Sequence, residues 1–520
     1  MTGTAELMWR WADTTPDAPA LREGERSWTF DELRTGIRGA MEELTRRGVR
    51  PGDRVLVVVP TSAEFVLTYH ALLALGATAV TVNPLCTQRE LTHFVQDAGC
   101  SFAIGWHEGA QALTATAQEG GLDAWVLEPG CVPQPEGTPE PASVGTDDPA
   151  VLLYTSGTTG APKGAILTHG NLLGCGASLA EALDLGPRES MGTALPLFHV
   201  FGQSSVMFTV YTAGGCLSLQ RPFDPAGLLR MAADEQLTAV AGVPTMWNAM
   251  LHADTDVAPQ DLTSLRLACS GGAALPLEVA KAFRERFGAV VLDGYGLSET
   301  AGAATFNRAD LPRKEMSVGR ALPGGALAIF DDDRNQLPPG ETGEVAIAGP
   351  YVMSGYWQRP DATAAVFEGE WFLTGDIGRM DEDGDLWIVD RKKDLVIRGG
   401  YNVYPREIEE VLYGHPDIRE AAVIGVPDER LGEEIAAVVT PQPGHERAGR
   451  GDRRGQFRQR IGGLPIGRRL GMRGRGHGRC PVLGRYLGAE GQVMFDLARG
   501  QVGHVDRLEL PQLIRALAQQ

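Results

Sequence analysis

The chain has 520 residues, of which 43% are hydrophobic and 22% are charged. This composition excludes a chain that is disordered over its whole length, and so long a chain is expected to form at least two packed units. The net charge of −19 argues against general nucleic-acid binding, and we expect no nucleic-acid partner.

The cysteines and the first residues indicate the compartment. The seven cysteines are scattered, and they form neither a close pair nor the spacing with histidine that a metal site needs. The opening residues, MTGTAELMWRWADTTPDAP, lack the basic and apolar regions of an export signal. We therefore expect a reduced, cytoplasmic protein.

Residues 65–88 carry no charge and are long enough to cross a bilayer. Their pattern changes from helix-like in FVLTYHALLAL to strand-like in TAVTVN, so a buried helix followed by a strand is favoured over a transmembrane segment. Similar alternation along the first 440 residues predicts an α/β fold with a largely parallel, helix-covered sheet. Expected strands include residues 54–59, 80–82, 151–154, 290–292 and 345–347, with a helix over 277–287.

The strongest local signal is the segment LLYTSGTTGAPKGAILTHGN, which begins at Leu152. Its loop has no large side chains and exposes backbone N–H groups, while hydroxyls and the Lys163 ammonium add donors that suit phosphate. It is not a Walker A loop, because Gly164 and a strand follow Lys163. A flexible connector is the alternative, but it does not explain Pro-Lys-Gly between two apolar runs. The predicted phosphate cradle consists of Thr155, Ser156, Gly157, Thr158, Thr159 and Gly160, with Lys163 as its cation.

The segment TSGTTGAPKG resembles the signature loop of the adenylate-forming superfamily, which includes acyl-CoA synthetases, luciferase and peptide-synthetase adenylation domains. The resemblance implies further motifs in a fixed order, and they are present. In PLFHVFG, His199 would lie beside an acyl pocket, with a satisfied half-buried histidine as the alternative. In SGGAALP, the resemblance places Gly271, Gly272 and Ala273 on the adenine side, although an ordinary strand-to-helix turn would look the same.

The motif DGYGLSET is a second strong match to the superfamily. The resemblance implies that Gly294, Tyr295 and Gly296 lie beside the adenine, that Thr300 reaches a phosphate oxygen, and that Glu299 is the metal ligand for Mg²⁺. Magnesium at nucleotide sites takes one or two carboxylates together with phosphate oxygens. A helix cap is the alternative for the Thr300 hydroxyl, and a solvated carboxylate is the alternative for Glu299.

The remaining motifs are WFLTGD, DRKKD and GGYNVYPREIE. The resemblance implies that Asp376 accepts hydrogen bonds from the ribose hydroxyls and that Arg391 donates from the other side. It also places Lys393 at a hinge between two domains, although a charged run by itself is usually a solvated face. Gly399 and Gly400 would line the passage for the pantetheine arm of CoA.

The resemblance is expected to end near residue 442, where a Gly- and Arg-rich tail begins. Family members continue to a lysine that bridges the carboxylate and the adenylate phosphate, whereas no lysine follows Lys393 here. Residues 444–485 contain 12 Gly and 12 Arg. Three interpretations of this tail are possible. It is a basic RNA- or phosphate-binding arm, a divergent lid with Arg in place of the lysine, or an out-of-frame read. The out-of-frame read is favoured because the chain has 42 Arg and five Lys, which is typical of GC-rich coding DNA. A shifted reading frame in such DNA readily encodes Gly and Arg.

The predicted domains follow from these motifs. We expect a large adenylate-forming domain over residues 1–389, a hinge with the start of a small α+β domain over 390–442, and a poorly ordered or out-of-frame tail over 443–520. The small domain would then be incomplete, because Arg- and Gly-rich residues cannot offset their ordering entropy by burial.

The resemblance implies an ATP-dependent carboxylic acid:CoA ligase, closest to the fatty acyl-CoA ligases of fatty acid metabolism, with ATP, Mg²⁺ and CoA as cofactors. The carboxylate attacks the ATP α-phosphorus to give acyl-AMP and pyrophosphate, and the CoA thiol then displaces AMP. The missing lysine predicts weak adenylation. An acyl-AMP ligase that loads a carrier protein and a non-catalytic acyl-adenylate binder are the alternatives. The positions expected to line the acyl pocket are small or apolar, and they favour an apolar acyl group. They are Phe201, Val243, Pro244 and Gly271.

Overall fold

The computed structural model describes residues 3–155, 162–308, 310–398, 401–415, 418–428, 432–441, 484–487 and 493–496. The chain divides into two compact units. Unit 1 comprises Met1–Leu275, Val279–Thr374 and Met380–Trp387, and unit 2 comprises Pro276–Glu278, Gly375–Arg379 and Ile388–Gln520. The domain limits that the sequence predicts at residues 389 and 442 stay a prediction.

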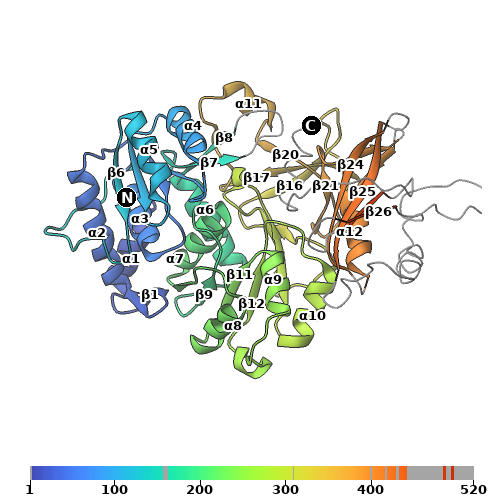
Figure 1. The fold of residues 1–520 in the computed structure, drawn as a ribbon, viewed down its shortest axis with the longest axis horizontal. Coiled ribbons are helices and arrows are strands. Elements are labelled where there is room, and N and C mark those ends of the chain that lie inside the picture. The colour runs from blue at the N-terminus through green and yellow to red at the C-terminus, as the bar shows by residue number, and fades with distance from the viewer. Residues whose placement is uncertain are drawn as a thin grey trace, which may run out of the picture. The chain divides into compact units, whose positions relative to one another are not determined.

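A seven-stranded sheet in unit 1 carries the predicted phosphate loop (Figure 1). Its five strands from β7 to β6 are parallel, and β8 and β18 continue the sheet antiparallel. The largely parallel sheet that the sequence predicts is therefore confirmed. Its strand order is β18 (Gly355–Tyr356), β8 (Lys163–Thr168), β7 (Pro149–Thr155), β4 (Thr78–Thr81), β3 (Arg54–Val58), β5 (Phe102–Trp106) and β6 (Asp123–Leu127).

The uncharged segment 65–88 forms a buried helix and then a strand, as predicted. Helix α3 (Ala63–Ala74) has every residue buried, and β4 follows it in the centre of the sheet. Ser62 caps α3 by accepting a hydrogen bond from the N–H of Phe65. The other helices that precede β7 are α1 (Ala5–Thr14), α2 (Phe30–Arg46), α4 (Gln88–Ala98) and α5 (Ala110–Gly120).

His70 lies in α3, and neither of its ring nitrogens has a hydrogen bond with the residues that the structure describes. Its ring centre lies 5.5 Å from that of Phe208 and 5.6 Å from that of Tyr211. Burial lowers the pKa of His70 to about 3. The folded protein therefore keeps this imidazole neutral at pH values where the unfolded chain protonates it.

Replacing His70 is expected to change how stability depends on pH. Because unfolding takes up a proton at His70 below about pH 6.5, its contribution to stability falls as the pH falls toward 3, by up to about 1.4 kcal/mol per pH unit. We expect His70→Phe to show a smaller loss of unfolding free energy than the parent chain between about pH 7 and about pH 5 in urea titrations. Equal losses in both chains would contradict this. His169, whose pKa burial also lowers, to about 4, is left unchanged in both.

A second, nine-stranded sheet in unit 1 positions the motifs around residues 270 and 295 (Figure 1). Its strands from β13 to β1 are parallel, so their carboxyl ends meet at one edge, where ligands of such sheets bind. Ser270 at the end of β12 pairs with Asp293 of β13. The strand order is β15 (Arg320–Ala321), β14 (Thr305–Phe306), β13 (Val291–Tyr295), β12 (Leu267–Ser270), β11 (Ala239–Gly242), β9 (Ser190–Thr193), β10 (Cys216–Leu219), β1 (Pro19–Glu23) and β2 (Arg26–Thr29).

Helical segments connect the strands of the second sheet. One of them, η1 (Phe201–Phe208), is a π-helix, a rare form that is frequently found at functional sites. Helix α10 (Leu277–Phe287) forms where the sequence predicts it. The others are α6 (His169–Ala182), α7 (Thr209–Ala213), α8 (Pro225–Asp234), α9 (Pro244–Leu251), and the short turns η2 (Pro259–Leu262) and η3 (Ser298–Thr300).

Two antiparallel sheets complete the described fold. The first consists of β16 (Ala326–Phe330), β17 (Thr342–Ala348), β20 (Trp371–Met380), β19 (Phe367–Glu368) and β21 (Leu386–Arg391), and α11 (Pro360–Ala365) precedes β19. The second, in unit 2, consists of β23 (Tyr401–Val403), β22 (Val396–Arg398), β25 (Gly432–Pro441), β27 (Val493–Asp496), β26 (Gly484–Leu487) and β24 (Ile418–Asp428), with helix α12 (Pro405–Tyr413). The α/β fold with a smaller mixed unit is thus confirmed, whereas most of the tail after residue 442 lies outside the described residues.

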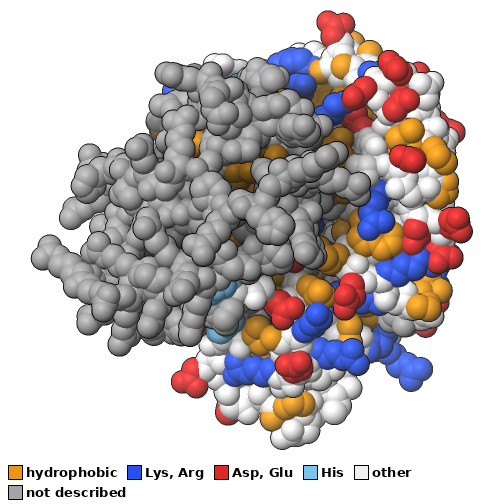
Figure 2. All heavy atoms as spheres, turned by 90° about the vertical axis from the view of Figure 1, so that its right-hand side faces the viewer, with side chains coloured by type: hydrophobic (Ala, Val, Ile, Leu, Met, Phe, Trp, Pro, Cys, Tyr) orange, Lys and Arg blue, Asp and Glu red, His pale blue; other side chains and the backbone are white. Residues whose placement is uncertain are grey.

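Figure 2 shows acidic and basic side chains interspersed over the described part of one face. Among the described residues, ion pairs join oppositely charged side chains, such as Arg266 with Glu189 and Arg308 with Asp310. Of the helices in the described part of the chain, none combines the length and the hydropathy needed to cross a bilayer.

Candidate active site

The β7–β8 hairpin carries the ends of the predicted phosphate loop. Thr155, the last residue of β7, pairs with Lys163, the first residue of β8. The Nζ atom of Lys163 lies 5.2 Å from the centre of the Tyr356 ring, a cation–π contact. The loop residues between them lie outside the described residues, so the predicted cradle stays a prediction for Ser156, Gly157, Thr158, Thr159 and Gly160.

Glu299 is a buried carboxylate, with 8% of its surface exposed. Its Oε1 accepts a hydrogen bond of 2.8 Å from the Tyr356 hydroxyl, while Oε2 accepts none from the described residues. A buried carboxylate with an oxygen that no described residue bonds suits the Mg²⁺ that the resemblance implies here. Lys163 and Glu299 are far apart in the sequence, but both contact Tyr356. Lys163 contacts its ring, and Glu299 contacts its hydroxyl.

The backbone of the turn that carries Glu299 packs closely against Cys175 and Ser205. Ala301 has a positive φ of 49°, and its carbonyl accepts from the Cys175 thiol at 3.2 Å. Gly302 has a φ of 92°, and a Cβ atom there would lie 2.5 Å from the hydroxyl oxygen of Ser205. Glycine is required at this position, and the turn has little freedom to move Glu299.

Thr300 uses its hydroxyl within the same turn. Its Oγ1 accepts a hydrogen bond of 2.9 Å from the N–H of Leu297 and lies 3.2 Å from the Leu297 carbonyl. The residue is fully buried. These bonds are those of the capping alternative, and the contact of Thr300 with a phosphate oxygen stays a prediction.

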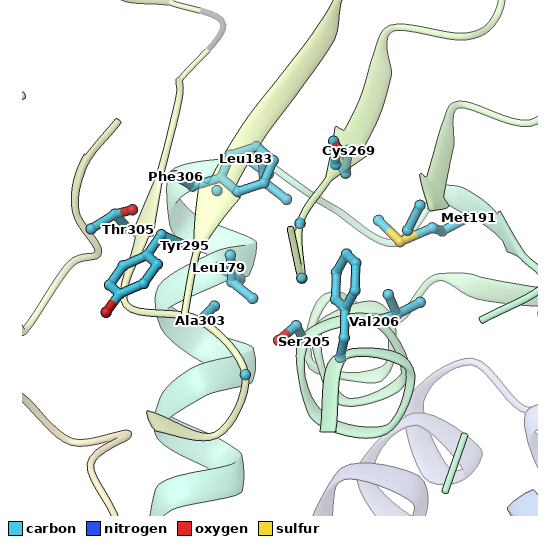
Figure 3. Close-up of a pocket in the computed structure, with 17 residues that line it drawn as sticks. Leu179, Leu183, Met191, Ser205, Val206, Cys269, Tyr295, Ala303, Thr305 and Phe306 are labelled. Carbon is cyan, nitrogen blue, oxygen red and sulfur yellow. The ribbon is translucent and has the colours of Figure 1, made fainter. Parts of the chain in front are cut away.

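An apolar pocket opens at the carboxyl ends of β12 and β13, with an open volume of about 30 Å³. Leu179 and Leu183 lie on one side of it, and Met191 and Val206 lie on the other (Figure 3). The Tyr295 hydroxyl points away from Met191 and Val206 in the same view. The remaining lining residues are Phe201, Ser205, Ala241, Cys269, Ser270, Gly271, Gly272, Gly294, Gly302, Ala303, Thr305 and Phe306.

Glycines shape this pocket. A Cβ atom at Gly271 would lie 3.3 Å from the Phe201 ring, so this ring packs directly on the backbone. At Gly294 a Cβ atom would lie 2.4 Å from the Phe306 ring, and at Gly296 one would lie 2.5 Å from the Cα of Ala303. The backbone therefore needs glycine at residue 294 in the pocket and at residue 296 beside it, and the Phe201 ring fills the space beside Gly271.

Two predicted residues lie at the edge of this arrangement. His199 is exposed, and its Nδ1 lies 3.3 Å from the backbone N–H of Phe201. Ala273 is also exposed and is not among the residues that line the pocket. Roles for these two residues beside the acyl group and the adenine stay predictions.

The other predicted site residues belong to unit 2. Asp376 is 4% exposed, and one of its carboxylate oxygens lies 3.4 Å from Nε of Arg391. Lys393 is exposed in the turn after β21. Gly399 and Gly400 lie outside the described residues, so their role stays a prediction.

One cluster of acidic residues within the described ranges is close enough to share a cation. It consists of Asp381, Asp383 and Asp385. The Nζ of Lys314 lies 2.5, 2.6 and 3.2 Å from carboxylate oxygens of these three residues. The lysine supplies the positive charge, so the cluster is a salt-bridge network.

Comparison with known proteins agrees with this fold and site. A family model described as AMP-binding enzyme matches residues 8–357, and the AMP-binding enzyme C-terminal domain matches residues 407–465. A feruloyl-CoA synthase from an Amycolatopsis species is 39% identical, covering 84% of this chain and 88% of its own. A long-chain-fatty-acid–CoA ligase from Bacillus subtilis is 34% identical, covering 82% and 84%. The crystal structure of ATP-bound MatB from Rhodopseudomonas palustris has 32% identity and a TM-score of 0.79, covering 85% of this chain and 89% of that one.

A chain with this fold and this likeness is an AMP-forming acid–thiol ligase, which uses ATP, Mg²⁺ and CoA and works through an acyl-AMP. It belongs to the AMP-binding enzyme family, whose model matches more than half of its length. The match to the C-terminal family model extends to residue 465, further than the limit near residue 442 that the motifs predict.

Proposed function

We propose that the enzyme activates an apolar monocarboxylic acid, which enters the pocket at the ends of β12 and β13 when the Phe201 ring turns aside, since the open volume with the ring in place is only about 30 Å³. The observation that carries this proposal is the pocket lining, which includes no Asp, Glu, Lys, Arg or His. An apolar lining favours an apolar acyl group and disfavours a second charge. The relatives named for feruloyl and long-chain fatty acids support the same class.

The carboxylate of the acid would lie at the end of the pocket formed by Gly302 and Ala303. Gly302 is three residues after Glu299 in the chain, which supports a position for this end next to the proposed phosphate site. There a carboxylate oxygen attacks the ATP α-phosphorus, an acyl–phosphate bond forms and pyrophosphate leaves. The CoA thiol then attacks the acyl carbon, and AMP leaves.

The protein's own contribution is mainly electrostatic. Lys163 and the backbone N–H groups of the phosphate loop would meet the negative charge that grows on the phosphate oxygens. Magnesium, when bound to Glu299, neutralises further phosphate charge. The capped turn of Thr300 holds Glu299 in place, and Tyr295 would pack on the adenine. In unit 2, Asp376 and Arg391 would bind the ribose, Lys393 would serve the hinge, and Gly399 and Gly400 would admit CoA.

A matched pair of acids tests the apolar pocket. We expect octanoate to support ATP–pyrophosphate exchange far better than octanedioate, which has the same length and a second carboxylate. Burying that uncompensated charge costs several kcal/mol, so the ratio of kcat/KM is expected to be at least about 100-fold. Equal exchange with both acids would contradict the proposal. A cinnamate-type acid, tested alongside, shows whether flat acyl groups are preferred to saturated ones.

Two alternatives to a CoA ligase can be distinguished, one by the thiol acceptor that it uses and the other by the absence of turnover. If the enzyme loads a carrier protein, pyrophosphate exchange proceeds but CoA does not consume the acyl-AMP, whereas a holo-carrier does. If the chain only binds acyl-adenylate, MgATP and acid raise its melting temperature without exchange, in keeping with the lysine that its tail lacks.

The cytoplasm remains our proposal for the site of action. All six cysteines within the described residues are free thiols, as expected in a reducing compartment. Burial raises the pKa of the Cys86 thiol to about 11, so this partly exposed thiol stays protonated and weakly reactive.

A further inference from the structure

We propose that Tyr356 is a positioning residue that keeps Lys163 and Glu299 apart and aims each at MgATP. The inference rests on the proposed function of this site. It concerns a residue that lies outside every sequence motif considered above.

Tyr356 contacts the two charged residues through different parts of its side chain. Its hydroxyl donates to Oε1 of Glu299 at 2.8 Å, and its ring receives the Lys163 ammonium at 5.2 Å from the centre. A carboxylate can only accept in this bond, so the Tyr356 hydroxyl is the donor. The carboxylate keeps Oε2 for a metal ion, and the ammonium keeps its protons for phosphate.

The backbone around Tyr356 is fixed to the phosphate-loop hairpin. Tyr356 pairs with Ala165 across β18 and β8, and the N–H of Trp357 donates to the Gly164 carbonyl at 2.7 Å. The N–H of Tyr356 also donates to the Thr363 hydroxyl at 2.9 Å. A residue fixed on both sides can hold its partners in place instead of following them.

A second set of contacts ties this segment to the base of the phosphate loop. Asp97 accepts hydrogen bonds from the Tyr154 hydroxyl at 2.7 Å and from the Arg359 guanidinium at 2.6 Å. Its carbonyl accepts from the Trp357 indole at 3.2 Å. Tyr154 is the residue before Thr155, so residues 356–359 connect the end of the loop to the carboxylate of Glu299.

The charges explain why a neutral aromatic residue is needed here. Lys163 and Glu299 carry opposite charges and approach the same side chain, and Lys163 forms no salt bridge with the described residues. Without the ring, the two side chains would form an ion pair, which would take the ammonium from phosphate and the carboxylate from Mg²⁺. Tyr356 therefore preserves both charges for the nucleotide.

The test compares MgATP binding by calorimetry in the full chain and three variants. We expect Tyr356→Phe, which keeps the ring, to weaken MgATP binding about 10-fold, since a hydrogen bond to a charged group is lost. Tyr356→Leu, which lets the ion pair form, is expected to weaken it about 100-fold. Tyr351→Phe is the matched control, because Tyr351 is fully buried and its hydroxyl donates to the Ala304 carbonyl at 3.3 Å.

A second comparison separates positioning from a purely structural role. If an ion pair between Lys163 and Glu299 causes the loss of MgATP affinity in Tyr356→Leu, adding Lys163→Met breaks that pair and frees Glu299. The Mg²⁺ concentration for half-maximal ATP binding of this double variant is then expected to return toward that of Lys163→Met alone. MgATP affinity in both Tyr356 variants equal to that of Tyr351→Phe would overturn the inference while leaving the proposed function intact. No MgATP binding by the unmodified chain would overturn both.

Discussion

Glu299→Gln is expected to lower the rate of acid-dependent ATP–pyrophosphate exchange by about 100- to 1,000-fold, the size of effect seen when one group that stabilises transition-state charge is removed. The amide keeps the shape of the side chain and can still bond to Tyr356, whose hydroxyl lies 2.8 Å from Oε1. It lacks the negative charge that Mg²⁺ requires, so the loss should reside in metal-dependent steps.

Raising Mg²⁺ should recover part of the exchange rate of Glu299→Gln, which a merely unfolded variant would not do. Glu341→Gln serves as the control, because Glu341 is an exposed residue in the turn before β17. The melting temperature without nucleotide should stay close to that of the parent chain. Exchange within about threefold of the parent rate at low Mg²⁺ would exclude Glu299 as the metal ligand.

Phe201→Ala is expected to change acyl selectivity by about 10- to 200-fold in the ratio of kcat/KM for large over small acids, the range for pocket contacts of this size. The Phe201 ring fills the space beside Gly271, and the pocket has an open volume of only about 30 Å³. Removing the ring leaves a flat slot on the glycine backbone. Wider acids should gain, and acids that rely on contact with the ring should lose.

Ala241→Ile is the opposing variant, since Ala241 lines the same pocket from β11 and a larger side chain would shorten it. It should favour small acids, measured as pyrophosphate exchange with acids of increasing size. MgATP binding is measured in both variants, so that a change in selectivity between acids is separated from a change in nucleotide binding. Parallel loss of all acids in Phe201→Ala would instead indicate that the π-helix η1 had been disturbed.

The environment of His70 and the contacts of Tyr356 could not be predicted from the sequence. Nothing in the apolar run around His70 shows that both of its ring nitrogens lack hydrogen-bond partners among the described residues, because that depends on Phe208 and Tyr211 from a distant segment. Tyr356 follows a glycine in a two-residue strand and has no motif spacing to Glu299. Its importance appears only once β18 pairs with β8.

The sequence by itself determined the parallel sheets, the buried helix α3 followed by β4, and the family, because local periodicity and contiguous motifs need no long-range contact to be recognised. The resemblance also implies that Gly271, Gly272, Gly294 and Tyr295 lie beside the adenine, which stays a prediction; in the structure all four line the apolar pocket. Only the tertiary structure decided that the Phe201 ring packs beside Gly271, that the Thr300 hydroxyl caps its own turn, and that Tyr356 contacts both Lys163 and Glu299. These facts depend on side chains meeting across strands and turns far apart in the chain, which packing sets and local sequence does not.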